Sequence, residues 1–395
     1  MSPLEWAALL LALLVLLAVA ELAARALLVR CGRYYVWAPG ARLRLELDRT
    51  TLPMLEPVAR HAINSDGERG DEAPPDAGTF RVLVAGGSAA ECYYLDQHSQ
   101  WPHVLQEVLS RPENLARLGA RRVHVGNVAR SLVTCRHVDR ILEQTLERYA
   151  RIDAIVFLVG ASDVVTWMEQ GTPERIDEPP IPPGQVFAQH PEGPFGWSPR
   201  TLALRRIASA VKRRLLKPVE VRERAGKRLA EVRAMRAAAT TIIHTPPDPR
   251  PMVEHFAKWF ERCLRRAQAK APLVLAVRQP WLEKRFTPEE ERWLWSYAVG
   301  RPYHQTCTTY FSHEAAWALN RATDRRAAEV AARTGVAQLD LMPLLPADFA
   351  TWYDEQHHTP AGCRLVGEAI ARALVAAHER RGTALDAVPS AVPSA

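Results

Sequence analysis

The chain has 395 residues, of which 48% are hydrophobic and 24% are charged, and its formal net charge is +7 with a pI near 9.2. This length and apolar content suit one large domain with insertions or two smaller domains, and they exclude a chain that is disordered throughout. The positive charge would suit a polyanion or an anionic membrane surface, but neither zinc-finger spacing nor a basic stripe interleaved with aromatic residues is present, so we expect no nucleic-acid partner.

The first feature along the chain is an apolar stretch over residues 4–29, made almost entirely of Leu, Ala and Val. At about 1.5 Å per helical residue it is just long enough to span a bilayer. Its Glu21 and Arg25 are four residues apart, a spacing that allows an ion pair on one helix face. A cleaved signal peptide is the alternative, but no Lys or Arg precedes the apolar run and no clear small-x-small cleavage site follows it. We therefore predict that residues 1–30 form a retained, single-pass membrane anchor.

The basic residues around this stretch bear on which side of the membrane the body lies. No Lys or Arg precedes the apolar run, whereas five arginines lie at its end or after it, namely Arg25, Arg30, Arg33, Arg42 and Arg44. The positive-inside rule favours a cytoplasmic body, but the side remains open at this stage.

Five short apolar runs predict buried strands, and helical patterns separate them. The strands are expected at 80–85, 122–127, 152–160, 273–278 and 336–341, and the helices at 101–110, 138–149, 252–269 and 313–333, with a last helix starting at Pro360. Strands that alternate with helices indicate a parallel sheet in an α/β fold. Residues 31–79 contain few apolar runs and several turn formers, so we expect a lead-in segment that packs on the edge of the domain.

The middle of the chain breaks this alternation. Prolines and glycines crowd residues 173–199, which predicts an insertion without regular structure. Residues 202–236 then form a basic stretch that we expect to be helical. It could lie against anionic lipid near the anchor or cap the active site, but a solvated helix face is the interpretation we favour.

Two further sequence features have simple structural interpretations. Residues 281–310 are rich in aromatic side chains and could roof a pocket, although ordinary packing is the favoured explanation. The six cysteines form no Cys-x-x-Cys pair, so neither a metal site nor a disulfide framework is indicated, and we expect small buried side chains.

A candidate nucleophile follows the first predicted strand of the sheet. The run 80–85 ends at Gly86-Gly87, where the backbone is free to turn sharply, and Ser88 comes next. In an open α/β sheet the chemistry lies at the carboxyl ends of the strands, so the Ser88 hydroxyl is expected in the site crevice. Gly-Gly-Ser is also ordinary turn chemistry, so this motif needs support from elsewhere.

That support comes from the segment just before the last helix. A serine hydroxyl needs a base to take its proton, and the base needs a carboxylate to fix its tautomer and stabilise the imidazolium. Asp354 and His357 lie three residues apart in one predicted loop, so the carboxylate can bond one ring nitrogen while the other faces Ser88. The three residues together predict a Ser-His-Asp triad.

At this point the chain resembles the SGNH or GDSL-type hydrolases, which carry four sequence blocks on a flavodoxin-like sheet. The first block resembles Gly86-Gly87-Ser88, and the last resembles Asp354-Glu355-Gln356-His357 followed by Thr359-Pro360-Ala361-Gly362, an interval that selects His357 over His358 as the base. The second block is similar to Asn127-Val128-Ala129, with Ala in place of the family's Gly. The third is similar to Gly160-Ala161-Ser162-Asp163, with Ser in place of the family's Asn.

The resemblance implies roles for the remaining site residues. The oxyanion hole would consist of the backbone N–H groups of Ser88 and Ala129 with the hydroxyl of Ser162. Ser162 is shorter than the family's Asn, and the loss of one such donor typically costs about 10²–10³ in rate. Substrate-binding roles are expected for Asn127, Gly160 and Asp163.

The implied activity is that of a serine esterase, a carboxylic ester hydrolase that acts on an oxygen ester, such as a small acyl group on a glycan or lipid. Water would complete the reaction in a hydrolase, and a sugar hydroxyl would complete it in an O-acyltransferase. No metal or dissociable cofactor is called for. The alternative is a catalytically silent binding protein on the same fold, in a membrane-associated complex. Protein partners are unknown.

Two other classes are disfavoured by the motifs. Gly86-Gly87-Ser88 begins neither a Gly-x-Gly-x-x-Gly nor a Gly-x-x-x-x-Gly-Lys loop, so a nucleotide-binding domain is not expected. The nucleophile elbow of an α/β-hydrolase requires glycine two residues on either side of the serine, and position 90 is Ala.

The predicted fold is therefore a flavodoxin-like, three-layer α/β fold with a parallel sheet of about five strands, behind an N-terminal membrane helix. The expected organisation is an anchor (1–30), a lead-in (31–79), a first hydrolase part (80–172), a Pro-rich and basic helical insertion (173–250), a second hydrolase part (251–382) and a disordered tail (383–395).

Overall fold

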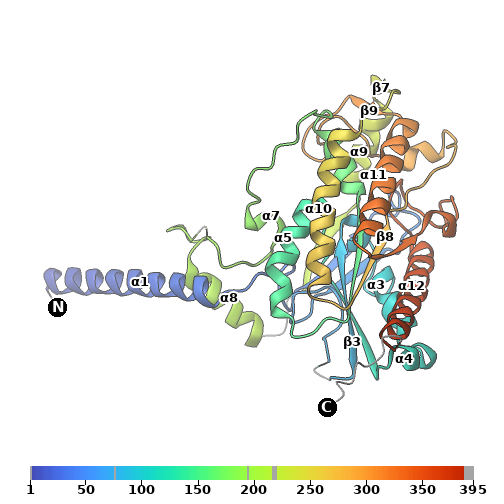
Figure 1. Cartoon of the computed structure of the whole chain (residues 1–395). Coiled ribbons are helices and arrows are strands. Elements are labelled where there is room, and N and C mark those ends of the chain that lie inside the picture. The colour runs from blue at the N-terminus through green and yellow to red at the C-terminus, as the bar shows by residue number, and fades with distance from the viewer. Residues whose placement is uncertain (1, 75–76, 194, 216–219, 387–395) are drawn as a thin grey trace, which may run out of the picture.

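The computed structural model describes residues 2–74, 77–193, 195–215 and 220–386 (Figure 1). At its centre is a five-stranded sheet in the order β10-β8-β5-β3-β4, with all neighbouring strands parallel. The strands are β3 (Thr79–Gly86), β4 (Arg122–Asn127), β5 (Ala154–Val159), β8 (Leu273–Arg278) and β10 (Ala337–Asp340). The predicted α/β class and its five strands are thus confirmed, and the strand order is that of the flavodoxin-like fold.

The helices that follow these strands agree with the predicted alternation. They are α2 (Ser88–Glu91), α3 (Trp101–Leu109), α4 (Pro112–Leu118), α5 (Cys135–Thr145), α6 (Ala161–Glu169), α10 (Arg250–Gln268), α11 (His313–Arg333) and α12 (Pro360–Asp386). Short 3₁₀ turns occur at Leu146–Arg148, Glu290–Trp293 and Met342–Leu344.

Both faces of the central sheet are covered, which explains the continuous apolar runs of its strands. In β5, Val156 and Leu158 join the hydrophobic core that includes α3 and α12, whereas Ile155 and Phe157 join the core that includes α5 and α10. Successive side chains of a strand point to opposite faces, so a strand covered on both sides is apolar at nearly every position. All six residues of β5 are buried. The sheet is therefore the middle layer of three.

A second sheet has no counterpart in the sequence-based expectations. In the lead-in, β1 (Arg42–Leu47) pairs antiparallel with β2 (Val58–Ala62), and β1 also pairs in parallel with β6 (Glu220–Ala225). The prediction of a helix over residues 202–236 is therefore wrong in the middle of that range. The segment consists of α8 (Ala203–Leu215), then β6, then α9 (Lys227–Ala237). The ladder to β1 satisfies the backbone of β6, and Gly226 (φ 128°) allows the sharp change into α9.

Three other features of the structure differ from the expectations. The Pro-rich insertion contains one helical turn, α7 (Pro183–Val186), where Pro183 occupies a first-turn position that needs no N–H donor. Strands β7 (Thr241–Ile243) and β9 (Thr309–Phe311) form a small parallel pair. The predicted tail is helical as far as Asp386, because α12 extends that far, and its remainder, 387–395, lies outside the described residues.

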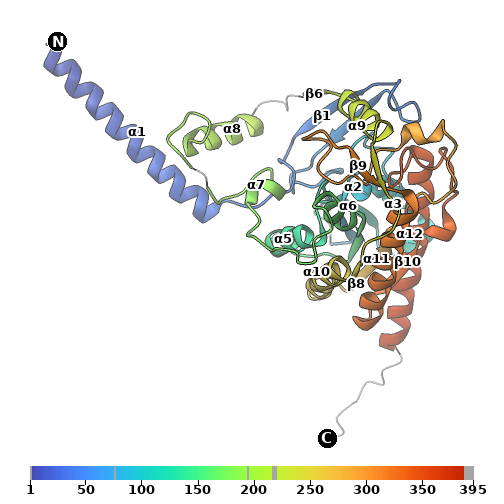
Figure 2. The same cartoon turned by 90° about the horizontal axis from the view of Figure 1, so that it is seen from above.

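The N-terminal helix α1 (Pro3–Cys31) projects away from the body in both views (Figures 1 and 2). It is long and apolar enough to cross a membrane, and only 11% of its most apolar window is buried. Its apolar side chains are therefore largely uncovered, unlike those of a core helix. Near its C-terminal end α1 contacts α8.

Candidate active site

Ser88 lies at the carboxyl edge of the central sheet, as the motif predicts. Strand β3 ends at Gly86, Gly87 is the N-cap, and Ser88 is the first residue of α2. Close approach requires glycine at position 86, where a Cβ would collide with the carbonyl oxygen of Leu158, and a Cβ at Gly87 would lie 2.9 Å from the Ser162 Oγ. The strand can therefore turn directly into the helix that presents Ser88.

His357 and Asp354 reach Ser88 from the loop before α12. The Nε2 atom of His357 lies 2.7 Å from the Ser88 Oγ, and Nδ1 lies 2.8 and 2.9 Å from the two carboxylate oxygens of Asp354. An ionised carboxylate only accepts hydrogen bonds, so Nδ1 carries the proton and Nε2 is left to accept one from the serine hydroxyl. The three predicted residues are brought together in the order that proton transfer requires.

The electrostatics of this pair favour a basic imidazole. Burial alone would lower the pKa of His357, but the charge and hydrogen bond of Asp354 outweigh it and raise that pKa above its usual value. Burial opposes ionisation of Asp354, yet the imidazole of His357 and further hydrogen bonds hold the pKa of the carboxyl below its usual value. Asp354 therefore stays charged, and the imidazole of His357 binds a proton more tightly than an ordinary histidine does.

The Asp354 loop is held by groups that the sequence did not single out. Backbone N–H groups of Gln356 and His357 each donate to Asp354 Oδ1 at 2.9 Å, and the indole of Trp295 donates to Oδ2 at 3.1 Å. The neighbouring Glu355 is fully buried and accepts the N–H groups of Trp295 and Ser296 at 2.8 and 2.9 Å. The aromatic segment 281–310 therefore braces the loop from its side.

His358 occupies a different environment from His357. Its ring packs on Trp352, with the ring centroids 4.4 Å apart, and neither of its nitrogens has a hydrogen-bond partner within the described residues. Burial lowers the pKa of His358 to about 3, so this imidazole is neutral. The two adjacent histidines thus differ in both contacts and charge.

The oxyanion side of the site is less complete than the base side. The N–H of Ser88 opens α2 and has no acceptor among the described residues, so it is free to donate. The N–H of Ala129, in contrast, already donates to the side-chain oxygen of Asn127 at 2.9 Å. The Ser162 hydroxyl lies beside Gly87 and has no hydrogen-bond partner in the described part of the chain. Two of the three predicted donors are available as the chain stands.

The residues expected to bind substrate lie inside the protein. Asn127 is buried and donates to the carbonyl oxygen of Ala90 at 2.8 Å, which ties β4 to the nucleophile helix. Gly160, with φ 124°, starts α6. The Asp163 carboxylate is buried and accepts the N–H of Cys135 at 3.1 and 3.2 Å, and burial raises its pKa to about 7. These contacts position the elements around Ser88, and contact of these three residues with substrate stays a prediction.

A buried arginine that the sequence analysis missed binds the C-terminal end of α2, the helix that begins with Ser88. Arg69 is 2% exposed, and its guanidinium donates to the carbonyl oxygens of Glu91, Cys92 and Leu95 at 2.6–2.9 Å. Burial lowers the pKa of Arg69 to about 10, so it remains charged at neutral pH. A lone Arg in a turn-rich segment gives no sequence signal for this role, since the role depends on which loop folds over it.

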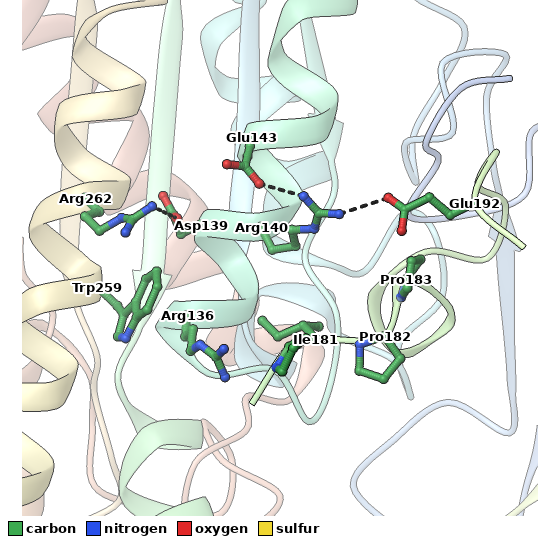
Figure 3. A pocket seen from close by; sticks show the side chains of 11 residues that line it. Arg136, Asp139, Arg140, Glu143, Ile181, Pro182, Pro183, Glu192, Trp259 and Arg262 are labelled. Carbon is green, nitrogen blue, oxygen red and sulfur yellow. Dashed lines mark hydrogen bonds and ion pairs between the residues drawn. The ribbon is translucent and has the colours of Figure 1, made fainter. Parts of the chain in front are cut away.

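No group of three His, Cys, Asp or Glu side chains within the described residues is placed to hold a metal ion. A cavity of about 460 Å³ lies between α5, α10 and the Pro-rich insertion (Figure 3), and none of the residues that line it belongs to the triad. Its charges are paired with each other: Arg140 bonds Glu143 and Glu192, and Arg262 bonds Asp139. The Arg140–Glu192 pair joins the insertion to α5, and the Arg262–Asp139 pair joins α10 to α5.

The fold and geometry define the chain as an open α/β protein with a Ser-His-Asp arrangement at the carboxyl edge of its sheet. No protein-family model and no curated protein matches its sequence. Solved structures that resemble it include an acetylxylan esterase from Geobacillus stearothermophilus (10% identity, TM-score 0.38) and a member of the lipolytic G-D-S-L family from Veillonella parvula (8% identity, TM-score 0.37). The match covers 75% of this chain and 94% of the first, and 74% of this chain and 97% of the second. Because the TM-scores lie below 0.5, the chemistry of this chain must be argued from its own residues.

Proposed function

We propose that the chain is a serine esterase of the SGNH or GDSL type that hydrolyses, or transfers, the acyl group of an oxygen ester. One observation carries the proposal: the unbroken hydrogen-bond chain from the Asp354 carboxylate through His357 to the Ser88 hydroxyl. Two chain segments 269 residues apart meet there within hydrogen-bond distance. The contact is not needed to form the helix that Ser88 begins, because the N–H groups of Ala90 and Glu91 already donate to the carbonyl oxygen of Gly87.

The mechanism that we propose follows from these contacts. The Ser88 oxygen attacks the ester carbonyl carbon while His357 Nε2 takes the hydroxyl proton, and Asp354 stabilises the imidazolium that forms. The tetrahedral intermediate collapses as its bond to the alcohol oxygen breaks, and His357 gives the proton to that leaving group. Water, or a sugar hydroxyl in a transferase, then attacks the acyl-enzyme with His357 again as base, and Ser88 regains its proton.

The oxyanion of the intermediate needs donors, and we assign these to Ser88 N–H and the Ser162 hydroxyl, with Ala129 N–H as the third. The Ala129 N–H now donates to the side-chain oxygen of Asn127. To serve as an oxyanion donor, it must leave that oxygen or divide its hydrogen bond between that oxygen and the oxyanion. A donor that must first be released contributes less to the transition state than a preorganised one. We therefore expect a slow or specialised esterase, acting on a small acyl group of a glycan or lipid.

A second candidate rests on the same observation. A silent binding protein would keep the triad contacts without stabilising an oxyanion, and the occupied Ala129 N–H with the short Ser162 side chain favours it. The two candidates differ in whether Ser88 is an activated nucleophile.

The test is covalent labelling of the full chain with a fluorophosphonate probe. The proposal predicts labelling that disappears in Ser88→Ala and in His357→Ala, while the control His358→Phe, which keeps a ring against Trp352, retains it. A folded wild-type protein that takes up no probe would refute the esterase and leave the binding protein as the better account.

We also propose that α1 anchors the protein in a membrane as a single span. Its apolar side chains are exposed along most of its length, and Trp6 is 63% exposed near its start. A helix with such a surface is stable in hydrocarbon and costly in water. Resistance of the full chain to extraction from membranes by alkaline carbonate is the expected result, and release into the soluble fraction would contradict it.

A further inference from the structure

The junction between α1 and α8 is built around a buried carboxylate. Glu21 is 2% exposed and accepts the backbone N–H groups of Ala203 and Leu204 at 2.8 and 3.0 Å, so it caps the N-terminus of α8. Arg25, one turn further along α1, bonds the same carboxylate at 2.9 Å. A negative charge at a helix N-terminus is favourable. The Glu21 carboxylate therefore holds the start of α8 beside this point of α1.

The position of this junction matches the depth of a membrane surface. Residues 6–20 of α1 carry no charge, and Glu21 is the first ionisable residue after them. Trp6 and Arg25 are separated by about 28 Å of helix, close to the thickness of a bilayer's hydrocarbon core. Tryptophan is enriched at both membrane surfaces. Trp6 marks one such level, and Glu21 and Arg25 mark the other.

A second exposed tryptophan lies at that other level. Arg25 donates to the carbonyl oxygen of Gly196 at 3.1 Å, and its guanidinium lies 4.3 Å from the centroid of the Trp197 ring. The Trp197 side chain is 64% exposed. The described residues leave most of this large ring uncovered, although the contacts of Arg25 hold it at the end of the apolar span.

Helix α8 has two distinct faces. Leu204, Ile207, Ala208 and Val211 follow the i, i+3, i+4, i+7 spacing of one apolar stripe, and Val211 is 50% exposed. Arg200, just before the helix, and Arg205 and Lys212 within it are also exposed. Residues 193–219 include seven Lys and Arg and no Asp or Glu, so no acid within this segment neutralises the basic face.

We propose that α8 and the preceding turn with Trp197 form a docking surface for anionic phospholipid headgroups. The helix lies in the surface of the leaflet from which α1 emerges, with its apolar stripe towards the acyl chains and its basic residues among the headgroups. The inference rests on the proposed membrane span of α1 but not on the esterase activity. In both views α8 lies beside the C-terminal end of α1, between it and the body (Figures 1 and 2).

Lipid fits this surface better than a protein partner does, because the membrane is already next to it. The Glu21 cap holds the start of α8 at the end of the apolar span, so the helix cannot leave the interface without breaking two backbone bonds. An amphipathic helix with Lys and Arg on its polar face and apolar side chains opposite is suited to an anionic interface. The active-site domain would thereby be held close to the bilayer.

The test places an environment-sensitive fluorophore on α8 in the full chain. The label is attached at Val211→Cys in a Cys31→Ser background, and the protein is reconstituted in phosphatidylcholine vesicles with or without phosphatidylglycerol. Lipids that carry a doxyl quencher near the headgroup report contact with the surface. Leu365→Cys on α12 is the control, because Leu365 is likewise an exposed aliphatic residue of a helix but lies on the body.

The proposal predicts quenching at position 211 that is strong with phosphatidylglycerol, weak without it, and absent at position 365. Arg205→Gln and Lys212→Gln should each lower the ratio of docked to undocked helix about fivefold. Equal quenching with and without the anionic lipid, or no effect of the neutralised residues, would overturn the docking surface. A label shielded equally in detergent would mean that protein covers the helix, which overturns it too.

Two parallel measurements separate the possible failures. Flotation of the chain with the vesicles tests the span of α1, so a protein that does not float refutes the anchor and the docking surface together. A protein that floats without quenching refutes the docking surface alone. Fluorophosphonate labelling in the same vesicles reports the esterase independently of both results.

Discussion

The base side and the oxyanion side of the Ser88 site differ in how completely their polar groups are arranged for catalysis. On the base side, every polar atom of the Asp354 carboxylate and of the His357 ring has a partner at 2.7–3.1 Å, and Trp295 adds a bond from outside the loop. On the oxyanion side, one predicted donor is already bonded to Asn127, and another is a short serine hydroxyl beside Gly87. In the proposed mechanism, activation of the nucleophile and stabilisation of the intermediate therefore depend on different parts of the site.

If the proposed mechanism holds, this difference predicts that the oxyanion side limits the rate. A preorganised base makes Ser88 reactive toward a strong electrophile such as a fluorophosphonate, which depends little on oxyanion stabilisation. Turnover of an ordinary ester depends on donors that are already aimed at the oxyanion. We expect fast covalent labelling together with slow ester turnover.

The largest effect is expected from removal of the nucleophile or its base. Ser88→Ala should abolish labelling, and His357→Ala should lower ester turnover by about 10⁴–10⁶. His358→Phe should stay near wild type, because neither nitrogen of His358 makes a hydrogen bond in the described residues. Comparable losses in the two histidine variants, both folded by circular dichroism, would show that His357 has no special role.

Asp354→Asn is expected to lower turnover by about 10⁴ while leaving the fold intact. The amide keeps the shape of the side chain but cannot hold the His357 tautomer or balance the imidazolium charge. Steady-state rates on a chromogenic acetyl ester measure the loss. Asp348→Asn, in the same loop region but bonded only to nearby backbone N–H groups, is the control, and an equal loss there would point to loop damage.

Changes on the oxyanion side should be smaller and should separate the two readouts. Ser162→Ala is expected to lower ester turnover about 10²-fold, the usual cost of one oxyanion donor, with a lesser effect on fluorophosphonate labelling. Ser162→Asn, which restores the longer amide found in the resembling family, should raise turnover. If Ser162→Ala matches wild type in both assays, the hydroxyl does not face the oxyanion.

The smallest effect concerns pH. His357 must be neutral to accept the proton, so labelling should increase with pH around the pKa of that imidazole. Asp354 raises this pKa, which places the inflection above the ordinary histidine value near 6.5. In Asp354→Asn the charge is gone and burial remains, so the inflection should move to lower pH. An unchanged inflection would mean that another group controls the profile.

The sequence was sufficient for the central sheet because its strands are short, mostly apolar and separated by helical patterns, and β5 is apolar at every position. It also sufficed to select Ser88, Asp354 and His357, since the two motifs lie at positions where a parallel sheet brings its loops together. The triad geometry agrees with that selection, and the roles of the three residues remain predictions to be tested.

Other features depend on tertiary contacts that no local pattern encodes. Strand β6 has an alternating, charged sequence that is compatible with a helix, and only its register against β1 makes it a strand. Arg69 gains its role from the loop that folds over it. The bond from Ala129 to Asn127 depends on how the turn after β4 closes, and it decides how many oxyanion donors are free.

The most direct test of the account is to trap the acyl-enzyme. The full chain is mixed with a chromogenic acetyl ester, quenched with acid during turnover, and analysed by intact mass and by peptide mapping. We predict a mass increase of one acetyl group on the peptide that contains Ser88, absent in Ser88→Ala and reduced in His357→Ala. Ester turnover without any acetyl group on Ser88, or acetylation elsewhere at the same rate, would contradict the proposed mechanism.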